Sequence, residues 1–295
     1  MTDVEINQNE KQRFDGLVSD FFDLSKEQEK IRIASWNCSS GFTTQFEHFQ
    51  DFMKTRAEPY IDILCLQGFP MGNKRKHDRI FKLFEECGFT YVYGESSEDF
   101  FVKTMTLFKR SFLELYSVIP DEGQSVSNVE IYYIKSKSGF FGDNGCSNHF
   151  LLSNVYLHHG CDKFKSLDRI DAYGFELWNP HQIIIGDFNY DVHKDRETQI
   201  SLCAWSKTPD IPTSNGYRAD HILSDIDIKC MVDERFTRGT YNKGYIHIPG
   251  NHFHQPIYGW FLPSKIGNEI PYFKDDVLID PTAGAFVRAI PDLPT

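Results

Sequence analysis

Short runs in which apolar and polar residues alternate recur along the chain, and this period of two predicts β-strands. Turn residues such as Pro, Gly, Asp and Ser separate some of these runs, as in the segment 120–125. The predicted strands cover residues 31–37, 61–67, 91–93, 104–119, 126–135, 150–157, 183–189, 217–222, 226–231, 245–248 and 255–261. Of these, 61–67 and 183–189 are predicted as buried strands, and the continuous apolar run of 183–189 is typical of a strand buried on both faces.

Apolar residues spaced three to four apart predict helices between these strands, over residues 10–30, 43–58, 74–87, 163–178 and 193–206. The apolar face of the first helix carries Phe14, Leu17, Val18, Phe21 and Phe22. This face predicts either a helix that packs on its own domain or one that docks a protein partner. Helices alternate with strands early in the chain and strand pairs occur in each half, which favours a layered α/β sandwich over a doubly wound parallel sheet.

No clear boundary divides the main body of the chain, although both ends differ from it in composition. We expect an acidic N-terminal helical extension over residues 1–30, one domain over residues 31–265, and a C-terminal surface tail rich in Pro and Asp over residues 266–295. A chain of 295 residues is long enough to bury a sizeable core, and its 26 Phe residues predict an aromatic one.

Charge and cysteine usage narrow the cellular setting and the partners. The net charge of −11 disfavours loose, non-specific nucleic-acid binding, although it leaves room for a local basic groove. The seven Cys residues are scattered without a CxxC pair, which is typical of reduced thiols in an intracellular protein, cytoplasmic or nuclear. No apolar stretch approaches the ~18 residues of a membrane span, so we expect no membrane association.

The run 183–189 ends in Asp187 and Asn189, two residues apart, so both side chains are expected to leave the strand on the same side. The pattern has two interpretations: an Asx turn after a buried strand, or a pair that holds a hard cation or orients a water molecule. Other predicted strands are also followed by polar residues. They are Asn37, Gln67, Tyr156, Asp220, His221, Asn251 and His252. If these strand ends share one edge, the polar groups line a common cleft.

Six motifs, taken in their order along the chain, resemble those of the endonuclease/exonuclease/phosphatase superfamily, which has the DNase I-like fold. They are Ser35-Trp36-Asn37, the run 62–67, Asn154-Val155-Tyr156, the run 186–189, the run 217–223 and the run 250–257. The third is similar to the form in apurinic endonucleases, and the fifth to that in non-LTR-retrotransposon endonucleases. The resemblance implies a four-layer α/β/β/α sandwich of two packed mixed sheets.

The resemblance also implies roles for particular residues. Asp187 and Asn189 would position the attacking water and contact the scissile phosphate, with Tyr156 and Asp220 lining the phosphate site. His252 would stabilise the developing charge. Asn37 and Asn251 would support a Mg²⁺ or Mn²⁺ ion, and nucleic acid would be a candidate partner. We also expect substrate contacts from Asn154 and His158, although a plain surface loop is the alternative for His158.

Two positions depart from the superfamily pattern. The second motif normally ends in Gln-Glu, and that Glu is the main metal ligand, whereas this chain has Gly68. The last motif normally has Asp before its His, whereas the run 250–257 has Asn251. Two hypotheses follow: a binding or scaffolding protein with weakened or lost phosphodiesterase activity, or an active but divergent metal-dependent phosphodiesterase.

The three histidines His247, His252 and His254 do not predict a transition-metal site. Spacings of five and two residues on strand-like segments would place them on different faces.

Overall fold

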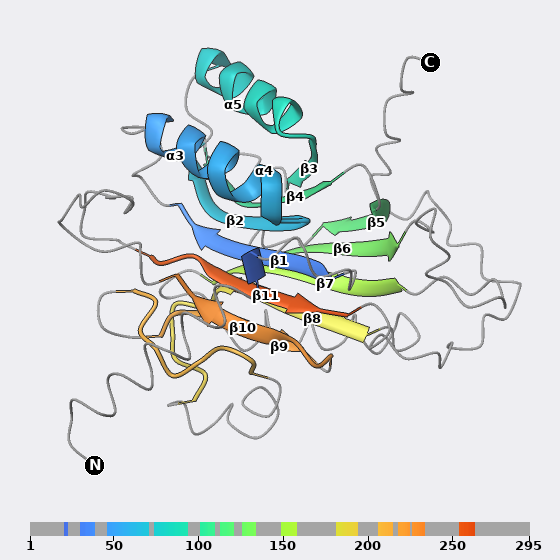
Figure 1. The fold of residues 1–295 in the computed structure, drawn as a ribbon, viewed down its shortest axis with the longest axis vertical. Coiled ribbons are helices and arrows are strands. Elements are labelled where there is room, and N and C mark those ends of the chain that lie inside the picture. Colours follow the sequence, from blue (N-terminus) through green and yellow to red (C-terminus); the bar gives the residue numbers. More distant parts are fainter. Residues whose placement is uncertain are drawn as a thin grey trace, which may run out of the picture.

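Two mixed β-sheets pack face to face, and a group of helices covers the outer face of one of them (Figure 1). The computed structural model describes residues 21–22, 30–38, 46–70, 74–93, 101–109, 113–120, 126–133, 149–157, 181–193, 206–214, 218–224, 226–233 and 254–262.

The six-stranded sheet has the order β10-β11-β1-β2-β4-β3, and the five-stranded sheet has the order β5-β6-β7-β8-β9. The strands of the first sheet are β1 (Ile31–Asn37), β2 (Ile63–Pro70), β3 (Phe89–Tyr93), β4 (Phe101–Lys109), β10 (Lys229–Val232) and β11 (Ile257–Phe261). Those of the second are β5 (Leu113–Pro120), β6 (Val126–Tyr133), β7 (His149–Tyr156), β8 (His181–Asp187) and β9 (Asp220–Ser224).

Each sheet contains one parallel pair of strands, β1 with β2 and β7 with β8, among antiparallel neighbours. Parallel strands end at the same edge, so their last residues lie side by side. In the six-stranded sheet Asn37 is paired with Gln67, and in the five-stranded sheet Tyr156 is paired with Asp187. Each sheet therefore presents a pair of polar residues at one end.

The face between the two sheets is apolar along most of its length and polar at that end. Ile31, Ile33, Ile183 and Ile185 belong to one buried cluster that joins the sheets. Two residues further along β8, in the same period-two row, the chain places Asp187. The same row of β8 side chains therefore contributes Ile183 and Ile185 to the core and Asp187 to the candidate site.

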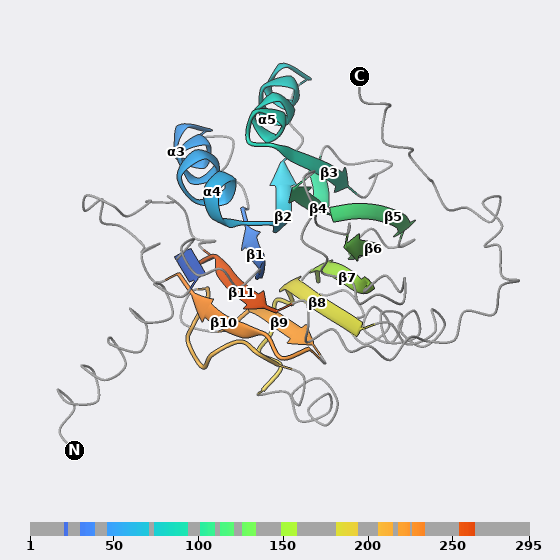
Figure 2. The same cartoon turned by 45° about the vertical axis from the view of Figure 1, so that its right-hand side comes forward.

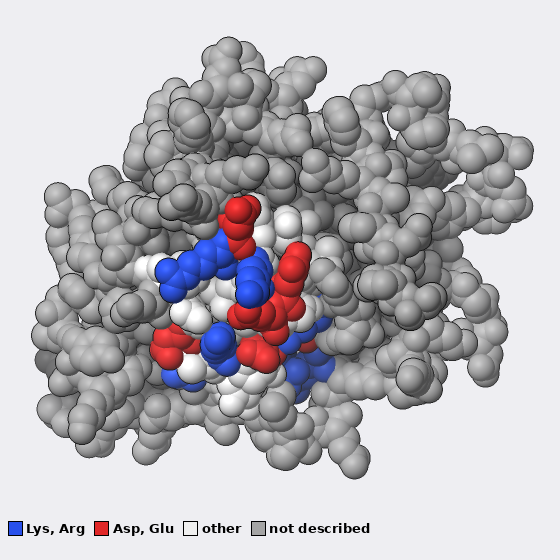
Figure 3. Space-filling view, turned by 90° about the horizontal axis from the view of Figure 1, so that it is seen from above, with Lys and Arg blue, Asp and Glu red and all other residues white. Residues whose placement is uncertain are grey.

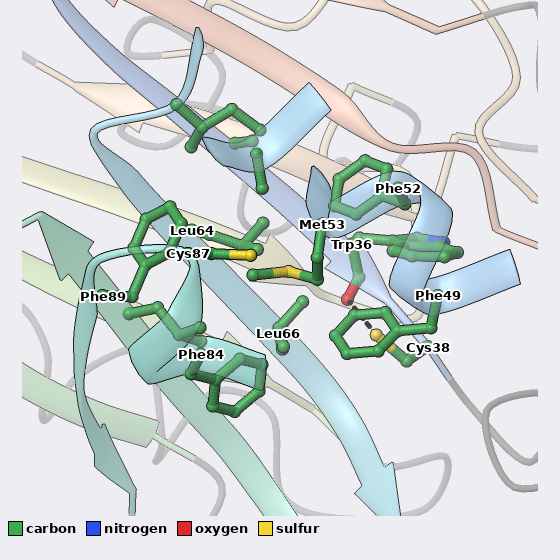
Figure 4. Packing of buried hydrophobic residues seen from close by; sticks show 14 of the residues in the cluster. Trp36, Cys38, Phe49, Phe52, Met53, Leu64, Leu66, Phe84, Cys87 and Phe89 are labelled. Atoms are coloured by element: carbon green, nitrogen blue, oxygen red, sulfur yellow. Dashed lines mark hydrogen bonds between the residues drawn. The ribbon is translucent and has the colours of Figure 1, made fainter. Parts of the chain in front are cut away.

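The opposite face of the six-stranded sheet packs against helices α3 (Phe46–Phe52), α4 (Glu58–Tyr60) and α5 (Lys74–Glu86), which lie together on one side of the sheet (Figure 2). Figure 4 shows this core, in which Trp36 of β1 packs against the rings of Phe49 and Phe52. Gly88 follows α5 with a φ of +76°.

The N-terminal segment packs on this same core where it is described. The Phe21 side chain is fully buried between Tyr258 and Trp260, with ring centroids 5.0 and 5.6 Å away. Phe22 lies edge-on against Tyr60 at 4.8 Å. The contacts of Phe21 and Phe22 favour a helix that packs on its own domain. Residues 1–20 lie outside the described part of the chain.

Two predicted elements differ from the structure. The single strand expected over residues 104–119 is two strands, β4 and β5, which belong to different sheets. The helix expected over residues 43–58 consists of α3, a π-helical turn η1 (Met53–Ala57) and α4. The helices expected over residues 163–178 and 193–206, and the strand 245–248, lie outside the described residues.

Among the described helices, none is both long and apolar enough to cross a lipid bilayer.

On the face viewed in Figure 3, basic and acidic side chains of the described residues are interspersed.

Candidate functional site

Gly186 allows the site to form because it lets β8 lie directly against β7. Its φ is +144°, and a Cβ atom at this position would lie 2.0 Å from the main-chain oxygen of Val155. Glycine alone accommodates both the backbone conformation and the close approach. The contact sets the register in which Asp187 lies beside Tyr156.

Asp187 and Asn189 form a tight turn immediately after β8. The main-chain N–H of Asn189 donates to Oδ1 of Asp187 at 2.8 Å, and its side-chain Nδ2 donates to Oδ2 at 3.1 Å and to the oxygen of Leu157 at 2.7 Å. The φ of Asn189 is +52°, a left-handed conformation that Asn tolerates better than most residues. The interpretation as an Asx turn is therefore confirmed, and the turn holds the two side chains next to each other; a role in holding a cation or orienting a water stays a prediction.

Asn37 reaches this turn from the other sheet. Its Nδ2 donates to Oδ2 of Asp187 at 2.6 Å and lies 3.4 Å from Nε2 of His254. Asn37 and Asp187 are both almost fully buried, with 4% and 0% exposure. The Asp187 carboxylate thus has donors from both sheets.

His254 and Asp220 complete the group. Nδ1 of His254 lies 2.8 Å from Oδ2 of Asp220, and because a carboxylate only accepts, this ring nitrogen carries the proton. Nε2 lies 3.9 Å from Oδ2 of Asp187 and 3.3 Å from Oγ of Ser214. The indole Nε1 of Trp36 donates to the main-chain oxygen of His254 at 3.2 Å. His254 is therefore held through both its ring and its backbone.

A buried ion pair ties the two acid-bearing segments together. Nη2 of Arg218 lies 3.0 Å from Oδ1 of Asp191, and both side chains are about 7% exposed. The main-chain N–H of Phe188 donates to the oxygen of Ala219 at 2.9 Å. The turn that carries Asp187 is thereby fixed against the residues that precede Asp220.

Burial and the neighbouring charges shift the pKa values of Asp187, His254 and Tyr156. Burial raises the pKa of Asp187, and the neighbouring Asp220 carboxylate raises it further, while His254 and the donors Asn189 and Asn37 act in the opposite direction. Burial lowers the pKa of His254, but Asp220 and Asp187 outweigh it and bring the pKa to about 9. Near neutral pH the imidazolium of His254 is therefore paired with Asp220. Burial, together with Asp187, raises the pKa of Tyr156, so its hydroxyl stays protonated.

Asp187, Asp220 and His254 each offer one ligand atom, and these atoms lie within 4.8 Å of one another. Oδ1 of Asp220 is buried and has no hydrogen-bond partner, so this acceptor is available to a cation. A divalent cation held by the two carboxylates and Nε2 of His254 would therefore displace the proton that this nitrogen carries near neutral pH. This ligand set differs from the metal set of the superfamily motifs, which relies on the position of Gly68.

Gly68 itself has a φ of +60°, the left-handed conformation in which most side chains are strained. A side chain introduced at this position would therefore have to adopt a conformation that glycine adopts without strain.

Asn154 lies beneath the site and is engaged by the core. Its side chain is fully buried, accepts from Nε2 of Gln67 at 2.8 Å, and donates to the oxygen of Met105 at 3.0 Å and to Oγ1 of Thr106 at 3.2 Å. The prediction that Asn154 contacts the substrate is corrected on this basis, because its amide links the two sheets.

Of the other predicted site residues, the structure brings Asn37, Asp187, Asn189 and Asp220 together, with Tyr156 next to Asp187 on the neighbouring strand. Asn251, His252 and His158 lie outside the described residues. The histidine that the structure places in the site is His254, which the sequence interpretation had set aside.

A signal for His254 was present in the sequence. The last motif of the superfamily has a His closely followed by Pro, and Pro256 lies two residues after His254 but four after His252. The position of the Pro therefore favours His254 over His252 as the histidine of this motif.

No protein-family model matches this sequence, and neither does the sequence of any curated protein. Several solved structures are similar in fold. An endonuclease/exonuclease/phosphatase family protein from Bacteroides thetaiotaomicron superposes with a TM-score of 0.55 at 13% identity, over 80% of this chain and 99% of its own. The human Nocturnin catalytic domain with a bound sulfate anion gives 0.54 at 12% identity, over 79% and 94%.

ANGEL2, described as a 2′,3′-cyclic phosphatase in complex with adenosine-2′,3′-vanadate, gives a TM-score of 0.54 at 12% identity, over 81% of this chain and 97% of its own. The chain therefore has the fold of the endonuclease/exonuclease/phosphatase superfamily, a DNase I-like α/β sandwich, as the ordered motifs predicted.

Proposed function

We propose that this chain uses the phosphodiesterase fold as a binding or scaffolding module for phosphoesters, with metal-dependent hydrolysis weakened or lost. The observation that carries the proposal is Gly68, which stands where the superfamily has its metal-binding Glu and has a φ of +60°. Metal assistance is worth several kcal/mol of transition-state stabilisation, so its loss lowers turnover by orders of magnitude.

The state of Asp187 supports the same proposal. Its carboxylate has 0% exposure and accepts hydrogen bonds from Asn37 and Asn189. Burial also raises its pKa. A carboxylate that is enclosed and satisfied in this way is a poor activator of water, because a general base must reach the proton it removes.

Phosphoesters are the proposed ligands because His254 supplies a positive charge at the ends of the parallel strands, where the amides of Asn37 and Asn189 converge. Nucleic acid is included as a proposed partner on the basis of the motif resemblance. Sulfate on Nocturnin and a nucleoside vanadate on ANGEL2 are ligands of those proteins that share this chemistry.

The second candidate function is an active, divergent metal-dependent phosphodiesterase. The free acceptor Oδ1 of Asp220, next to Asp187 and His254, favours it. An imidazole ligand suits Mn²⁺ better than Mg²⁺, since Mg²⁺ prefers oxygen ligands and waters. This function therefore predicts activity that depends on Mn²⁺ more than on Mg²⁺.

A matched pair of variants tests the role of position 68. Gly68→Asp restores a carboxylate and Gly68→Asn does not, and both residues tolerate the left-handed backbone better than Glu does. We expect Gly68→Asp to gain Mg²⁺-dependent cleavage of a generic phosphodiester that the wild type and Gly68→Asn lack. Equal activity in all three proteins would show that position 68 does not limit the reaction.

A further inference from the structure

Residues 206–214, which we call the strap, run along β9, the last strand of the five-stranded sheet as the structure describes it. The main-chain N–H of Lys207 donates to the oxygen of Ile222 at 2.8 Å, and the N–H of Ile222 donates to Oγ1 of Thr208 at 2.8 Å. A threonine hydroxyl therefore binds an edge N–H group that a further strand would otherwise bind.

The far end of the strap reaches the candidate site. Oγ1 of Thr213 accepts a hydrogen bond from the main-chain N–H of Asp220 at 3.0 Å. Ser214 forms an isolated antiparallel bridge with His254, and the main-chain N–H of Gln255 donates to the oxygen of Thr213 at 2.7 Å. The strap therefore links β9 to the segment that carries the histidine of the site.

The hydroxyl of Ser214 lies at the ring nitrogen of His254 that Asp220 does not bind. Nδ1 of the ring lies 2.8 Å from Oδ2 of Asp220, and Nε2 lies 3.3 Å from Oγ of Ser214. In the proposed function the ring is an imidazolium, so both nitrogens donate and Oγ of Ser214 accepts from Nε2. A phosphoester oxygen needs the same donor, so Ser214 competes with the ligand for it.

The site is closed in this conformation. Its five side chains are each at most 5% exposed: Asn37, Asp187, Ser214, Asp220 and His254. A phosphoester therefore reaches Nε2 of His254 only when a segment that covers the ring moves away.

The strap can move at low cost because its contacts with the domain are mainly polar. Of its residues, Ile211 is the one that packs against a described hydrophobic cluster, and it is only partly buried. The carboxylate of Asp210 lies 3.6 Å from Nη2 of Arg218 but is 96% exposed, so this ion pair adds little. Arg218 keeps its buried partner Asp191 when the strap leaves. Segments with few buried apolar contacts open more readily than core strands.

We propose that the strap is an autoinhibitory lid, which closes the site through Ser214 and must leave β9 before a phosphoester binds. The inference rests on the proposed function, because it concerns the regulation of the same site. On opening, the imidazolium of His254 exchanges its hydrogen bond to Ser214 for one to a phosphoester oxygen. The measured affinity is then the affinity of the open form multiplied by the fraction of molecules that are open.

Native-state hydrogen exchange of the purified full chain tests the opening without any ligand. The main-chain N–H groups of Asp220, Ile222 and Gln255, which the strap binds, are followed by NMR at increasing urea and compared with those of β8. We expect the strap-bound groups to exchange at least about 10-fold faster than those of β8, through an opening that does not depend on low concentrations of urea.

Thr208→Val is the variant that loosens the strap, because it removes the hydroxyl that accepts from Ile222 and changes no residue of the site. We expect the strap-bound N–H groups to exchange about 10-fold faster, since the closed form loses one hydrogen bond. Thr106→Val is the matched control: Thr106 is also buried, but its Oγ1 accepts from Nδ2 of Asn154 at 3.2 Å, between the sheets. Circular dichroism verifies that each variant is folded.

Calorimetry in EDTA, with inorganic phosphate and with adenosine 5′-monophosphate, measures the effect on binding. Thr208→Val should bind both probes about 10-fold more tightly than the wild type, because more molecules are open, and Thr106→Val should match the wild type. Ser214→Ala should also bind more tightly, since it removes the competing oxygen. A serine that contacted the ligand would instead give weaker binding in this variant.

The lid and the proposed function fail in different ways. Strap-bound N–H groups that exchange at the same rate and with the same urea dependence as β8, in a protein that binds phosphate, would overturn the lid. Weaker phosphate binding by Ser214→Ala would overturn it too. Local opening of the strap in a protein that binds neither probe, in the wild type or in any variant, would contradict the proposed function and with it the regulation of that site.

Discussion

Asn37 and Asp187 are 150 residues apart in the chain, and their side chains meet at 2.6 Å across the two sheets. Asn37 ends a strand of the six-stranded sheet and Asp187 ends a strand of the five-stranded sheet. Their hydrogen bond therefore joins the two halves of the fold at the polar end of their interface.

Asn37→Ala removes a donor from a carboxylate that has 0% exposure. Because a buried acceptor then loses a partner, we expect a loss of about 1–3 kcal/mol in the free energy of unfolding, measured by urea denaturation. Asn37→Asp places a second carboxylate against Asp187 and is expected to destabilise more at pH 8 than at pH 5. A protein whose stability is unchanged by both variants would contradict this view of the contact.

Gly186→Ala is expected to be among the most destabilising single-methyl additions in the chain. The new Cβ would lie 2.0 Å from the main-chain oxygen of Val155, which cannot move without separating β7 from β8. We expect a loss of about 3 kcal/mol or more by chemical denaturation. Gly88→Ala is the control: its φ is also positive, at +76°, but nothing lies within 4 Å of the added atom, so about 1 kcal/mol is expected. Equal losses would show that the close approach to Val155 is unimportant.

The free energy of unfolding is expected to depend on pH through the carboxyl group of Asp62. It accepts a hydrogen bond from the main-chain N–H of Arg32 at 2.7 Å, yet burial raises its pKa to about 7 against the effects of Arg32 and Lys109. The unfolded chain ionises this carboxyl near pH 4, so its stabilising contribution is fully present below that pH and is lost as the pH rises through about 7.

Asp62→Asn removes this dependence. The unfolding free energy of the variant, relative to that of the wild type, should increase between pH 4 and pH 7 by at most about 4 kcal/mol. Urea denaturation at several pH values measures the difference, and Asp51→Asn, a change on the exposed surface of α3, is the comparison. Parallel curves for the wild type and Asp62→Asn would argue against a protonated Asp62.

Phe21 tests whether the N-terminal segment belongs to the domain. Its ring is fully buried against Tyr258 and Trp260, and the side-chain Nε of Arg32 donates to its main-chain oxygen at 2.9 Å. Phe21→Ala should lower the free energy of unfolding by about 3 kcal/mol or more, since it leaves a cavity in an aromatic core. Phe22→Ala, at a half-buried position, should cost less. Unchanged stability in Phe21→Ala would indicate that this surface serves a partner instead.

Alternation of apolar and polar residues predicts many of the strands, whereas the continuous run Ile183-Ile184-Ile185 predicts β8 as a strand buried on both faces. Asp187 and Asn189 follow that run at a spacing of two, and Asp187 is the last residue of β8. The same rule cannot tell which sheet a strand joins, so the run 104–119 was predicted as one strand where β4 and β5 diverge.

The errors at the site have a similar origin. Asn154 and Asp187 both lie on strands that lead to the polar end of the interface between the sheets. Only the structure shows that the side-chain amide of Asn154 is hydrogen-bonded to Gln67, Met105 and Thr106. The spacing of the histidines does not predict the place of His254, because a spacing argument assumes one regular strand. His254 pairs with Ser214 as an isolated bridge ahead of β11 instead.

The most direct test of the central claim is phosphodiester cleavage by the wild type and by Asp187→Asn, which preserves the shape of the side chain and removes its charge. Plasmid, abasic duplex, RNA and bis-p-nitrophenyl phosphate are each incubated with Mg²⁺, with Mn²⁺ and with EDTA. A binding module with weakened or lost hydrolysis predicts wild-type rates indistinguishable from those of Asp187→Asn under every condition. Metal-dependent turnover by the wild type that Asp187→Asn abolishes would contradict it.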